Sequence, residues 1–192
     1  MTQPISITFS HVGVYVTNLD RMVDFYTRFL GFVVSDRGKT SGGGGIVFLT
    51  RDANEHHQFV LATGRPADLP FNVVNQISFR VDSLSTLRQL HAALESEPVT
   101  EIKPISHGNA LSVYFLDPEG NRVELLIDTP WYVPQPHRVP VDIMRPDDEV
   151  WAWIEKECRG TPGFKSRKDW MADIERKIAQ ATQARRQATV QH

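Results

Sequence analysis

The sequence has little of several features that would place it in a particular class of protein. It contains a single cysteine, Cys158, which excludes an intrachain disulfide. Its 21 Lys and Arg side chains against 23 Asp and Glu give a net charge of −2, which argues against nucleic-acid binding. No apolar run approaches the about 18 residues of a membrane span, and the N-terminus lacks a signal-peptide pattern. These absences predict a soluble, cytoplasmic protein that binds neither nucleic acid nor membranes.

Charge is distributed unevenly along the 192 residues. Residues 1–164 carry 14 basic and 20 acidic side chains, a net charge of −6, whereas residues 165–192 carry 7 and 3, a net charge of +4. The division predicts that the C-terminal segment is a separate element. A segment with this charge is typical of a solvated helix face or of a contact with an acidic neighbouring subunit, and we expect a homodimer.

An internal repeat organises the first two thirds of the chain. Three pairs of segments correspond: 10–19 with 75–84, 46–50 with 113–117, and 58–61 with 122–125. Each copy begins with an alternating strand pattern, continues with a helix of apolar spacing and ends with about three strands. Since one copy alone has too little sheet to cover both of its faces, pairing the copies would bury a core. We predict an α+β fold in which two βαβββ modules form one curved mixed sheet, followed by a C-terminal helical extension.

The boundaries follow from turn and cap signals. The predicted domain spans 5–130, with module one at 5–64 and module two at 72–128, and an extended segment and helical tail occupy 131–192. Thr17 is the predicted N-cap of the first module's helix, with Asp20 three residues later. Either Asp82 or Ser83 caps the second helix. Further cap signals predict two tail helices, one opening at Pro146 and Asp147 and one capped by Ser166 to Asp169.

Three side chains able to bind a metal lie at strand positions that the repeat relates. His11 lies in the first strand, Gln76 is its counterpart in the second module, and Glu124 lies in the last strand between Val123 and Leu125. A buried carboxylate needs a cation or hydrogen-bond donors, which favours a ligand role for Glu124. Taken alone, His11 would be interpreted as a hydrogen-bonded histidine of a strand. Its place in the repeat favours a role as a metal ligand. Gln76 fits either a ligand or a residue that hydrogen-bonds to water.

Two stretches of sequence resemble a known family. The first is Ser-His-Val-Gly-Val-Tyr-Val at 10–16, which leads into an aromatic helix end at 25–32. The second, at 112–125, holds a tyrosine in a strand, an Asp-Pro-Glu-Gly-Asn turn and Glu124. Over about residues 5–130 the chain resembles the vicinal oxygen chelate superfamily, which includes glyoxalase I, fosfomycin-resistance proteins and type I extradiol dioxygenases.

The resemblance implies that His11, Gln76 and Glu124 bind a divalent metal, with Fe(II) expected first and Mn(II), Zn(II) or Ni(II) as alternatives. Extradiol dioxygenases use two histidines and one carboxylate, so Gln76 departs from their pattern, and an amide oxygen should bind iron more weakly than imidazole. Glyoxalase-type members can use glutamine. Their additional carboxylate corresponds to Val60 in this sequence, which does not support a four-ligand glyoxalase site.

The resemblance also implies two catalytic side chains. His107, in a His-Gly-Asn stretch, corresponds to a proton donor, and Tyr114 to a tyrosine that hydrogen-bonds a substrate oxygen, although Tyr114 also fits a core aromatic residue. The implied activity is cleavage of a catecholic or related aromatic ring with dioxygen, in aromatic compound degradation. The alternatives are a glyoxalase-type metal-dependent lyase or isomerase and a metal-free protein that binds a small molecule.

Two other features have structural explanations. His56 and His57 are adjacent, so strand alternation would point them to opposite faces, and we interpret them as a turn or edge pair. Four glycines at 42–45 lack the residues of a phosphate-binding loop and predict a hairpin connection.

Overall fold

The computed structural model describes residues 7–66, 68–69 and 71–190, and forms two compact units. The N-terminal unit contains residues 7–75 and 116–121, and the C-terminal unit contains residues 76–115 and those from 122 onwards. Residues 5–6 of the predicted domain and residues 191–192 of the predicted tail lie outside the described residues.

The N-terminal unit is built from one βαβββ module. Its elements are β1 (Val12–Val16), α1 (Leu19–Arg28), β2 (Val33–Lys39), β3 (Gly45–Thr50) and β4 (Phe59–Thr63). The strands form a four-stranded sheet in the order β1-β4-β3-β2, in which β1 and β4 run parallel and the other pairs run antiparallel. The glycines at 42–45 connect β2 to β3 as a hairpin, as predicted.

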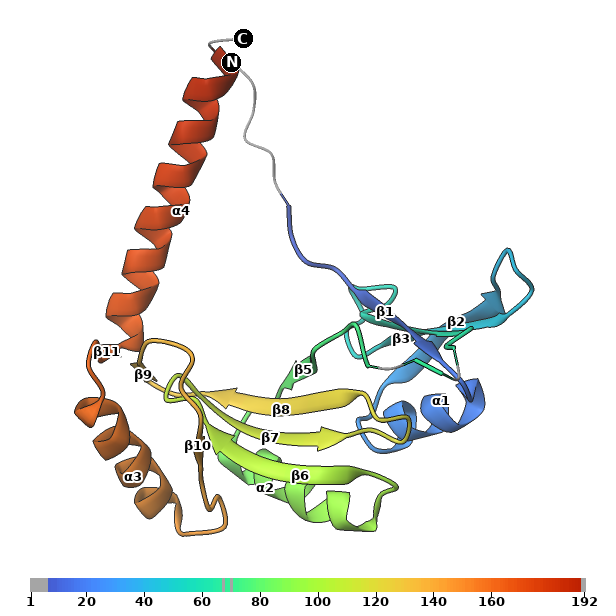
Figure 1. Cartoon of the computed structure of the whole chain (residues 1–192), viewed down its shortest axis with the longest axis horizontal. Helices are drawn as coiled ribbons and strands as arrows, with labels where there is room; N and C mark the ends of the chain where they lie inside the picture. Colours follow the sequence, from blue (N-terminus) through green and yellow to red (C-terminus); the bar gives the residue numbers. More distant parts are fainter. Residues whose placement is uncertain (1–6, 67, 70, 191–192) are drawn as a thin grey trace. The chain divides into compact units, whose positions relative to one another are not determined.

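The second module repeats this pattern in the C-terminal unit (Figure 1). Its elements are β5 (Ile77–Arg80), α2 (Leu84–Ala93), a 3₁₀ turn η1 (Leu94–Ser96), β6 (Thr100–Ser106), β7 (Ala110–Leu116) and β8 (Arg122–Asp128). The sheet order is β10-β6-β7-β8-β5, with β5 and β8 parallel. Both modules therefore place their strands in the order first, fourth, third, second, which confirms the two βαβββ units.

The prediction of one curved sheet is not confirmed, because the described strands of the two modules form separate sheets. In each module the first strand hydrogen-bonds to the last strand of the same module, β1 to β4 and β5 to β8. The alternation of apolar and polar residues predicts which face of a strand is buried. It does not specify which neighbour occupies the strand's hydrogen-bonding edge.

The N-cap of helix α1 lies one residue later than predicted. Asn18, rather than Thr17, is the N-cap, and its side-chain oxygen accepts a hydrogen bond from the Arg21 amide at 3.0 Å. The Thr17 amide donates instead to the carboxylate of Glu119, at 2.8 Å to Oε2. Glu119 also accepts from the Asn18 amide at 2.6 Å, so a negative charge lies at the positive end of the helix dipole.

The turn that joins β7 to β8 is held within the N-terminal unit. The Gly120 amide donates to the Asp117 carbonyl at 2.8 Å, which closes the turn expected from the Asp-Pro-Glu-Gly-Asn sequence. Asp117 is buried, and its Oδ2 accepts from the Tyr26 hydroxyl at 2.9 Å and from the Asn121 amide group at 2.8 Å. Burial raises the pKa of the Asp117 carboxyl above its ordinary value, and these donors oppose that rise.

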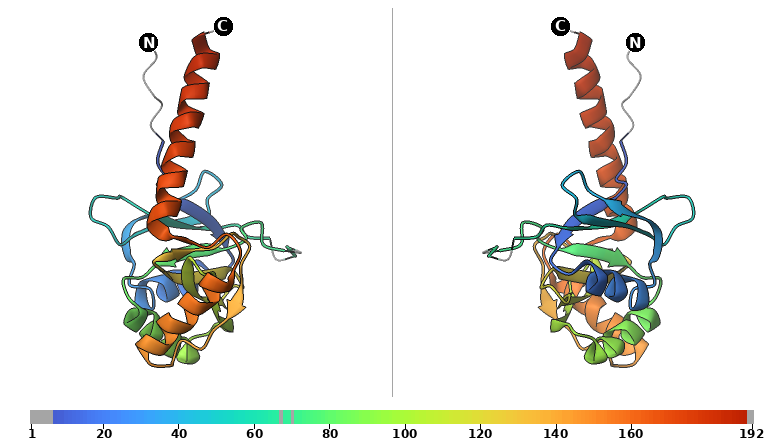
Figure 2. Two further views of the ribbon diagram at one scale, coloured as in Figure 1. Left: turned by 90° about the vertical axis from the view of Figure 1, so that its left-hand side faces the viewer. Right: turned by 90° about the vertical axis from the view of Figure 1, so that its right-hand side faces the viewer.

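The C-terminal extension follows β8 in the C-terminal unit. It contains β9 (Trp131–Tyr132), β10 (Val139–Pro140), α3 (Asp147–Gly160), β11 (Lys165–Ser166) and α4 (Arg167–Val190). Figure 2 shows α4 as one unbroken helix. Its predicted cap is confirmed, because Ser166 Oγ accepts from the Asp169 amide at 3.0 Å.

Aromatic contacts attach both tail helices to the extended segment. Trp131 lies against Trp151 of α3 with ring centroids 6.3 Å apart, and Tyr132 stacks on Trp170 of α4 at 5.5 Å. Val133, just beyond this strand, is fully buried. In the part of the chain that the structure describes, no helix combines the length and the hydropathy needed to cross a membrane.

Candidate functional site

One face of the C-terminal unit's sheet carries polar side chains. Side chains alternate along β7, so Ser112 and Tyr114 lie on one face while Leu111, Val113 and Phe115 lie on the other. In the parallel pair of β5 and β8, Ser78 is opposite Glu124. The apolar face is buried in the core, with α2 in contact with β8 (Figure 1). The polar face and its immediate surroundings hold six residues: Gln76, Ser78, His107, Ser112, Tyr114 and Glu124.

Glu124 is the centre of this group. It is only 5% exposed, yet three neutral donors surround its carboxylate. Oε2 accepts from Gln76 Nε2 at 2.7 Å and from Ser78 Oγ at 2.6 Å, and Oε1 accepts from Ser112 Oγ at 2.7 Å. These bonds replace the water that a buried carboxylate loses. The hydrogen-bond donors that a buried Glu124 was predicted to require are therefore present.

His107 is oriented by a backbone carbonyl. Its Nδ1 lies 2.7 Å from the carbonyl oxygen of His137, and since a carbonyl only accepts, Nδ1 carries a proton. In the neutral ring Nε2 is then an acceptor, and the Tyr114 hydroxyl donates to it at 2.9 Å. Nε2 also lies 3.8 Å from Glu124 Oε1. The arrangement fixes the tautomer that can take up a proton at the site.

Tyr114 is buried within the same group. Burial raises the pKa of its phenol above the ordinary value, and the neighbouring Glu124 carboxylate raises it further. Arg138 lies over the ring, with the guanidinium carbon 4.7 Å from the ring centroid. The tyrosine is therefore a neutral hydrogen-bond donor near neutral pH.

His11 belongs to the N-terminal unit and lies just before β1. Its ring contacts that of His57, with centroids 4.1 Å apart, and His57 Nδ1 lies 2.8 Å from His56 Nδ1. The expectation that His56 and His57 point to opposite faces is wrong. Both precede β4, so strand alternation does not apply to them.

Desolvation lowers the pKa of His57 below its ordinary value, and the adjacent imidazoles His11 and His56 lower it further. The described residues contain no group of three or more His, Cys, Asp or Glu side chains placed to hold a metal ion.

Comparison with known proteins identifies the family. Residues 8–125 match the Glyoxalase/Bleomycin resistance protein/Dioxygenase superfamily. The chain belongs to this superfamily. The resemblance to vicinal oxygen chelate proteins is thereby confirmed.

Two curated relatives of this superfamily member are dioxygenases. Over 124 residues it is 32% identical to biphenyl-2,3-diol 1,2-dioxygenase 2 of Rhodococcus globerulus, and 30% identical to biphenyl-2,3-diol 1,2-dioxygenase 3 of the same organism. Each alignment covers 62% of this chain and 62% of the relative, so the chain matches about three fifths of the length of each.

Solved structures share the fold at lower identity. The fosfomycin resistance protein FosX of Listeria monocytogenes, solved with Mn(II) and sulfate, is 19% identical with a TM-score of 0.52, covering 65% of this chain and 95% of that one. FosX of Mesorhizobium loti is 17% identical with a TM-score of 0.50, covering 63% and 91%. At this identity the likeness concerns the fold alone.

The C-terminal unit of this superfamily member contains oxygen atoms that can act as ligands of a divalent cation. Glu124 is a buried carboxylate, and Gln76 donates its NH₂ to Glu124 and to Ser78 Oγ at 3.1 Å, while no described side chain donates to its carbonyl oxygen. Carboxylate and amide oxygens are ordinary ligands of such ions. The structure thus brings together four of the predicted site residues, Gln76, His107, Tyr114 and Glu124, in one unit.

Four residues around this group were not predicted. Ser78 lies two positions after Gln76, and Ser112 lies two positions before Tyr114. Strand alternation places residues two positions apart on the same face, so this pattern could have predicted both serines. His137 and Arg138 come from the extended segment that follows β8, which carries no periodic pattern. Their proximity to His107 and Tyr114 arises only from the fold.

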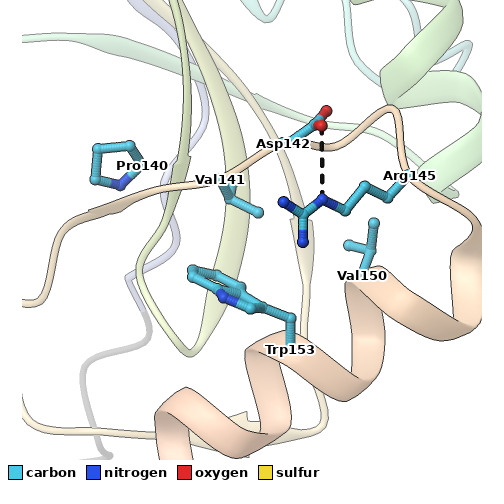
Figure 3. A pocket seen from close by; sticks show the side chains of 6 residues that line it. All are labelled: Pro140, Val141, Asp142, Arg145, Val150 and Trp153. Carbon is cyan, nitrogen blue, oxygen red and sulfur yellow. Dashed lines mark ion pairs between the residues drawn. The ribbon is translucent and has the colours of Figure 1, made fainter.

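A separate pocket of about 100 Å³ lies within the C-terminal extension (Figure 3). At its rim Arg145 Nε is 3.6 Å from Asp142 Oδ2. None of the predicted site residues borders it. Its lining residues are Pro140, Val141, Asp142, Arg145, Val150 and Trp153.

Proposed function

We propose that this protein is a metal-dependent extradiol dioxygenase that cleaves a catecholic or related aromatic ring with dioxygen. The observation that carries the proposal is the His107–Tyr114 pair beside buried Glu124. Tyr114 and Glu124 lie on one face of a single sheet, and His107 lies in the loop before β7. The relationship to two biphenyl-2,3-diol dioxygenases supports it.

In this proposal His11, Gln76 and Glu124 hold the ion, with Fe(II) expected and Mn(II), Zn(II) or Ni(II) as alternatives. The place of His11 in the set rests on the sequence repeat, whereas Gln76 and Glu124 are in contact at 2.7 Å. When bound, the ion supplies chelation of the two catechol oxygens and an electronic route between the ring and dioxygen.

The residues of the chain supply proton transfer and orientation. A catechol must lose protons to chelate. His107 Nε2 can take one up when the Tyr114 hydroxyl donates to a substrate oxygen instead, because the His137 carbonyl keeps the other nitrogen protonated. The Tyr114 hydroxyl, which has a raised pKa, stays protonated and donates to a substrate oxygen or to His107. Once charged, His107 can return its proton as the ring opens.

The decisive experiment is metal analysis of protein purified without oxygen, followed by Fe(II) addition and oxygen uptake with a panel of catechols. We expect about one ion per chain and oxygen uptake with at least one catechol. Glu124→Gln should lose both, whereas Glu95→Gln, an exposed position in η1, should keep both. No bound metal in the native protein would exclude an enzyme of either metal-dependent type.

Gln76→His tests the position that departs from the dioxygenase pattern. If Gln76 is a ligand, an imidazole there should raise iron affinity about tenfold or more and increase ring cleavage. An unchanged affinity would remove Gln76 from the ligand set.

A second candidate function is metal-free binding of a small aromatic molecule. It is favoured by the hydrogen bonds that already satisfy both oxygens of Glu124. A glyoxalase-type reaction would be favoured if the protein binds metal but shows no oxygen uptake with any catechol.

We also propose a cytoplasmic homodimer. Sedimentation equilibrium tests the oligomeric state.

A further inference from the structure

Arg138 holds a fixed place beside the candidate site although it comes from the C-terminal extension. The residue before it, His137, bonds through its carbonyl to His107, and its ring bonds to Glu157 of α3 at 2.9 Å. The residue after it, Val139, pairs with Ser106 in the ladder of β10 and β6. Backbone contacts on both sides therefore fix where the Arg138 side chain begins.

The guanidinium of Arg138 carries a charge that the described residues do not neutralise. It lies 4.7 Å from the centre of the Tyr114 ring, and within the described part of the chain no carboxylate pairs with it. Arg159 provides the contrast. It too lies over an aromatic ring, that of Phe164 at 5.2 Å, but Glu155 pairs with it at 2.6 Å.

The surroundings of Arg138 suit an anionic group on an aromatic ligand. Glu124 is held by neutral donors from Gln76, Ser78 and Ser112, and it makes no ion pair with Arg138. A guanidinium presents a planar fork of donors that matches a carboxylate in two hydrogen bonds. The guanidinium lies over the ring of Tyr114, the residue whose hydroxyl the proposed reaction uses.

We propose that Arg138 selects substrates whose aromatic ring carries a carboxylate side chain. The inference rests on the proposed function, since it assigns the substrate class of the same site. Arg138 binds the carboxylate while Tyr114 and His107 engage the ring oxygens, so the charged side chain sets the orientation of the ring.

The test compares 3-(2,3-dihydroxyphenyl)propanoate with its methyl ester, which have the same catechol and differ in charge. For the iron-loaded native protein, kcat/KM for the acid should exceed that for the ester about tenfold or more. Arg138→Gln should abolish this ratio and Arg138→Lys should reduce it, because lysine keeps the charge and loses the fork. Arg159→Gln, the matched control, should keep the ratio of the native protein.

Ionic strength provides a second readout. Arg138 is exposed, so salt would screen its ion pair with the substrate. The KM for the acid should therefore rise with added salt, and the KM for the ester should not. Equal losses for acid and ester in Arg138→Gln would overturn the inference, because they would show that Arg138 acts only through Tyr114.

Failure of the proposed function would look different. If neither compound is oxidised, titration calorimetry with the same two compounds decides the inference on its own. A tighter Kd for the acid that disappears in Arg138→Gln would support the carboxylate subsite without ring cleavage. Equal Kd values for acid and ester in the native protein would reject it.

Discussion

At the scale of single residues, Glu124 shows how a charged group is kept inside this sheet. Two serine hydroxyls and one amide donate to it, and Ser112 is fully buried. Removing one donor leaves part of a buried charge without compensation, which costs more than the hydrogen bond itself contributes.

Ser112→Ala should therefore lower the free energy of unfolding by about 1–3 kcal/mol in urea denaturation. Ser85→Ala, at an exposed position of α2, is the control and should have an effect within about 0.5 kcal/mol. Equal effects of the two substitutions would show that Glu124 does not depend on the Ser112 hydroxyl.

Tyr114→Phe separates the hydroxyl from the ring. The ring beneath Arg138 is kept, but the donor to His107 Nε2 is lost. We expect kcat for oxygen uptake with a cleaved catechol to fall about a hundredfold or more. Tyr132→Phe, which keeps the stacking on Trp170, should stay within about threefold of the native protein. Similar rates for both variants would remove Tyr114 from the proton path.

Cys158 should be chemically inert in the folded protein. Burial raises the pKa of its thiol to about 11, so only about one molecule in a thousand carries a thiolate at pH 8. Reaction with Ellman's reagent should be slow at pH 8 and should become fast in urea, where the pKa returns to its ordinary value. A rapid reaction before unfolding would contradict the buried position.

At the scale of elements, the loop from β6 to β7 is packed against the extension through Gly108. Its φ is +71°, and a Cβ there would lie 2.4 Å from Val133 Cγ2 and 3.2 Å from Cys158 Sγ. Only glycine meets both conditions, because a side chain would be strained and would also overlap the extension. The loop carries His107, so this packing positions a proposed catalytic residue.

Gly108→Ala should destabilise the protein by more than about 2 kcal/mol. Gly120→Ala is a matched control, since its φ is +78° but nothing lies within 4 Å of the added Cβ. It should cost only the backbone strain of about 1–2 kcal/mol. Thermal and urea unfolding measure the difference, and equal losses would mean that the extension yields to the extra methyl group.

At the scale of the whole molecule, the chain crosses from the N-terminal unit to the C-terminal unit at residues 75–76. The described part of the segment before this point exposes large apolar side chains, including Phe71 at 68% and Val73 at 80%. Segments with exposed side chains and no regular hydrogen bonds are the usual places of proteolytic cleavage.

Brief treatment with chymotrypsin should therefore cleave after Phe71, giving fragments that correspond to the two modules. A cut after Phe9, which is 85% exposed, would remove only the N-terminal end. Mass spectrometry identifies the fragments, and Phe71→Gln should suppress the internal cut. First cleavage within β5 to β8 would contradict the compactness of the C-terminal unit.

Local sequence patterns predicted the helices, strands and turns of this molecule, because the formation of each depends mainly on residues close to it in the sequence. The repeat predicted two βαβββ modules, and the Asp117–Asn121 turn and the Ser166 cap follow from side chains within a few positions. The cap of α1 was predicted one residue too early, because Thr17 and Asn18 are both good caps and the Glu119 carboxylate binds the Thr17 amide.

By itself the sequence determined the superfamily, the two modules and the polar residues of the second module, since motif spacing and strand alternation are properties of short segments. Only the tertiary structure decided that the modules form separate sheets, because the choice of a strand's partner depends on hydrogen-bonding edges that side-chain patterns do not encode. It also decided that His137 orients His107 and that Arg138 lies on Tyr114. Those contacts join residues up to 30 positions apart, and packing of the extension, rather than any local preference, brings them together.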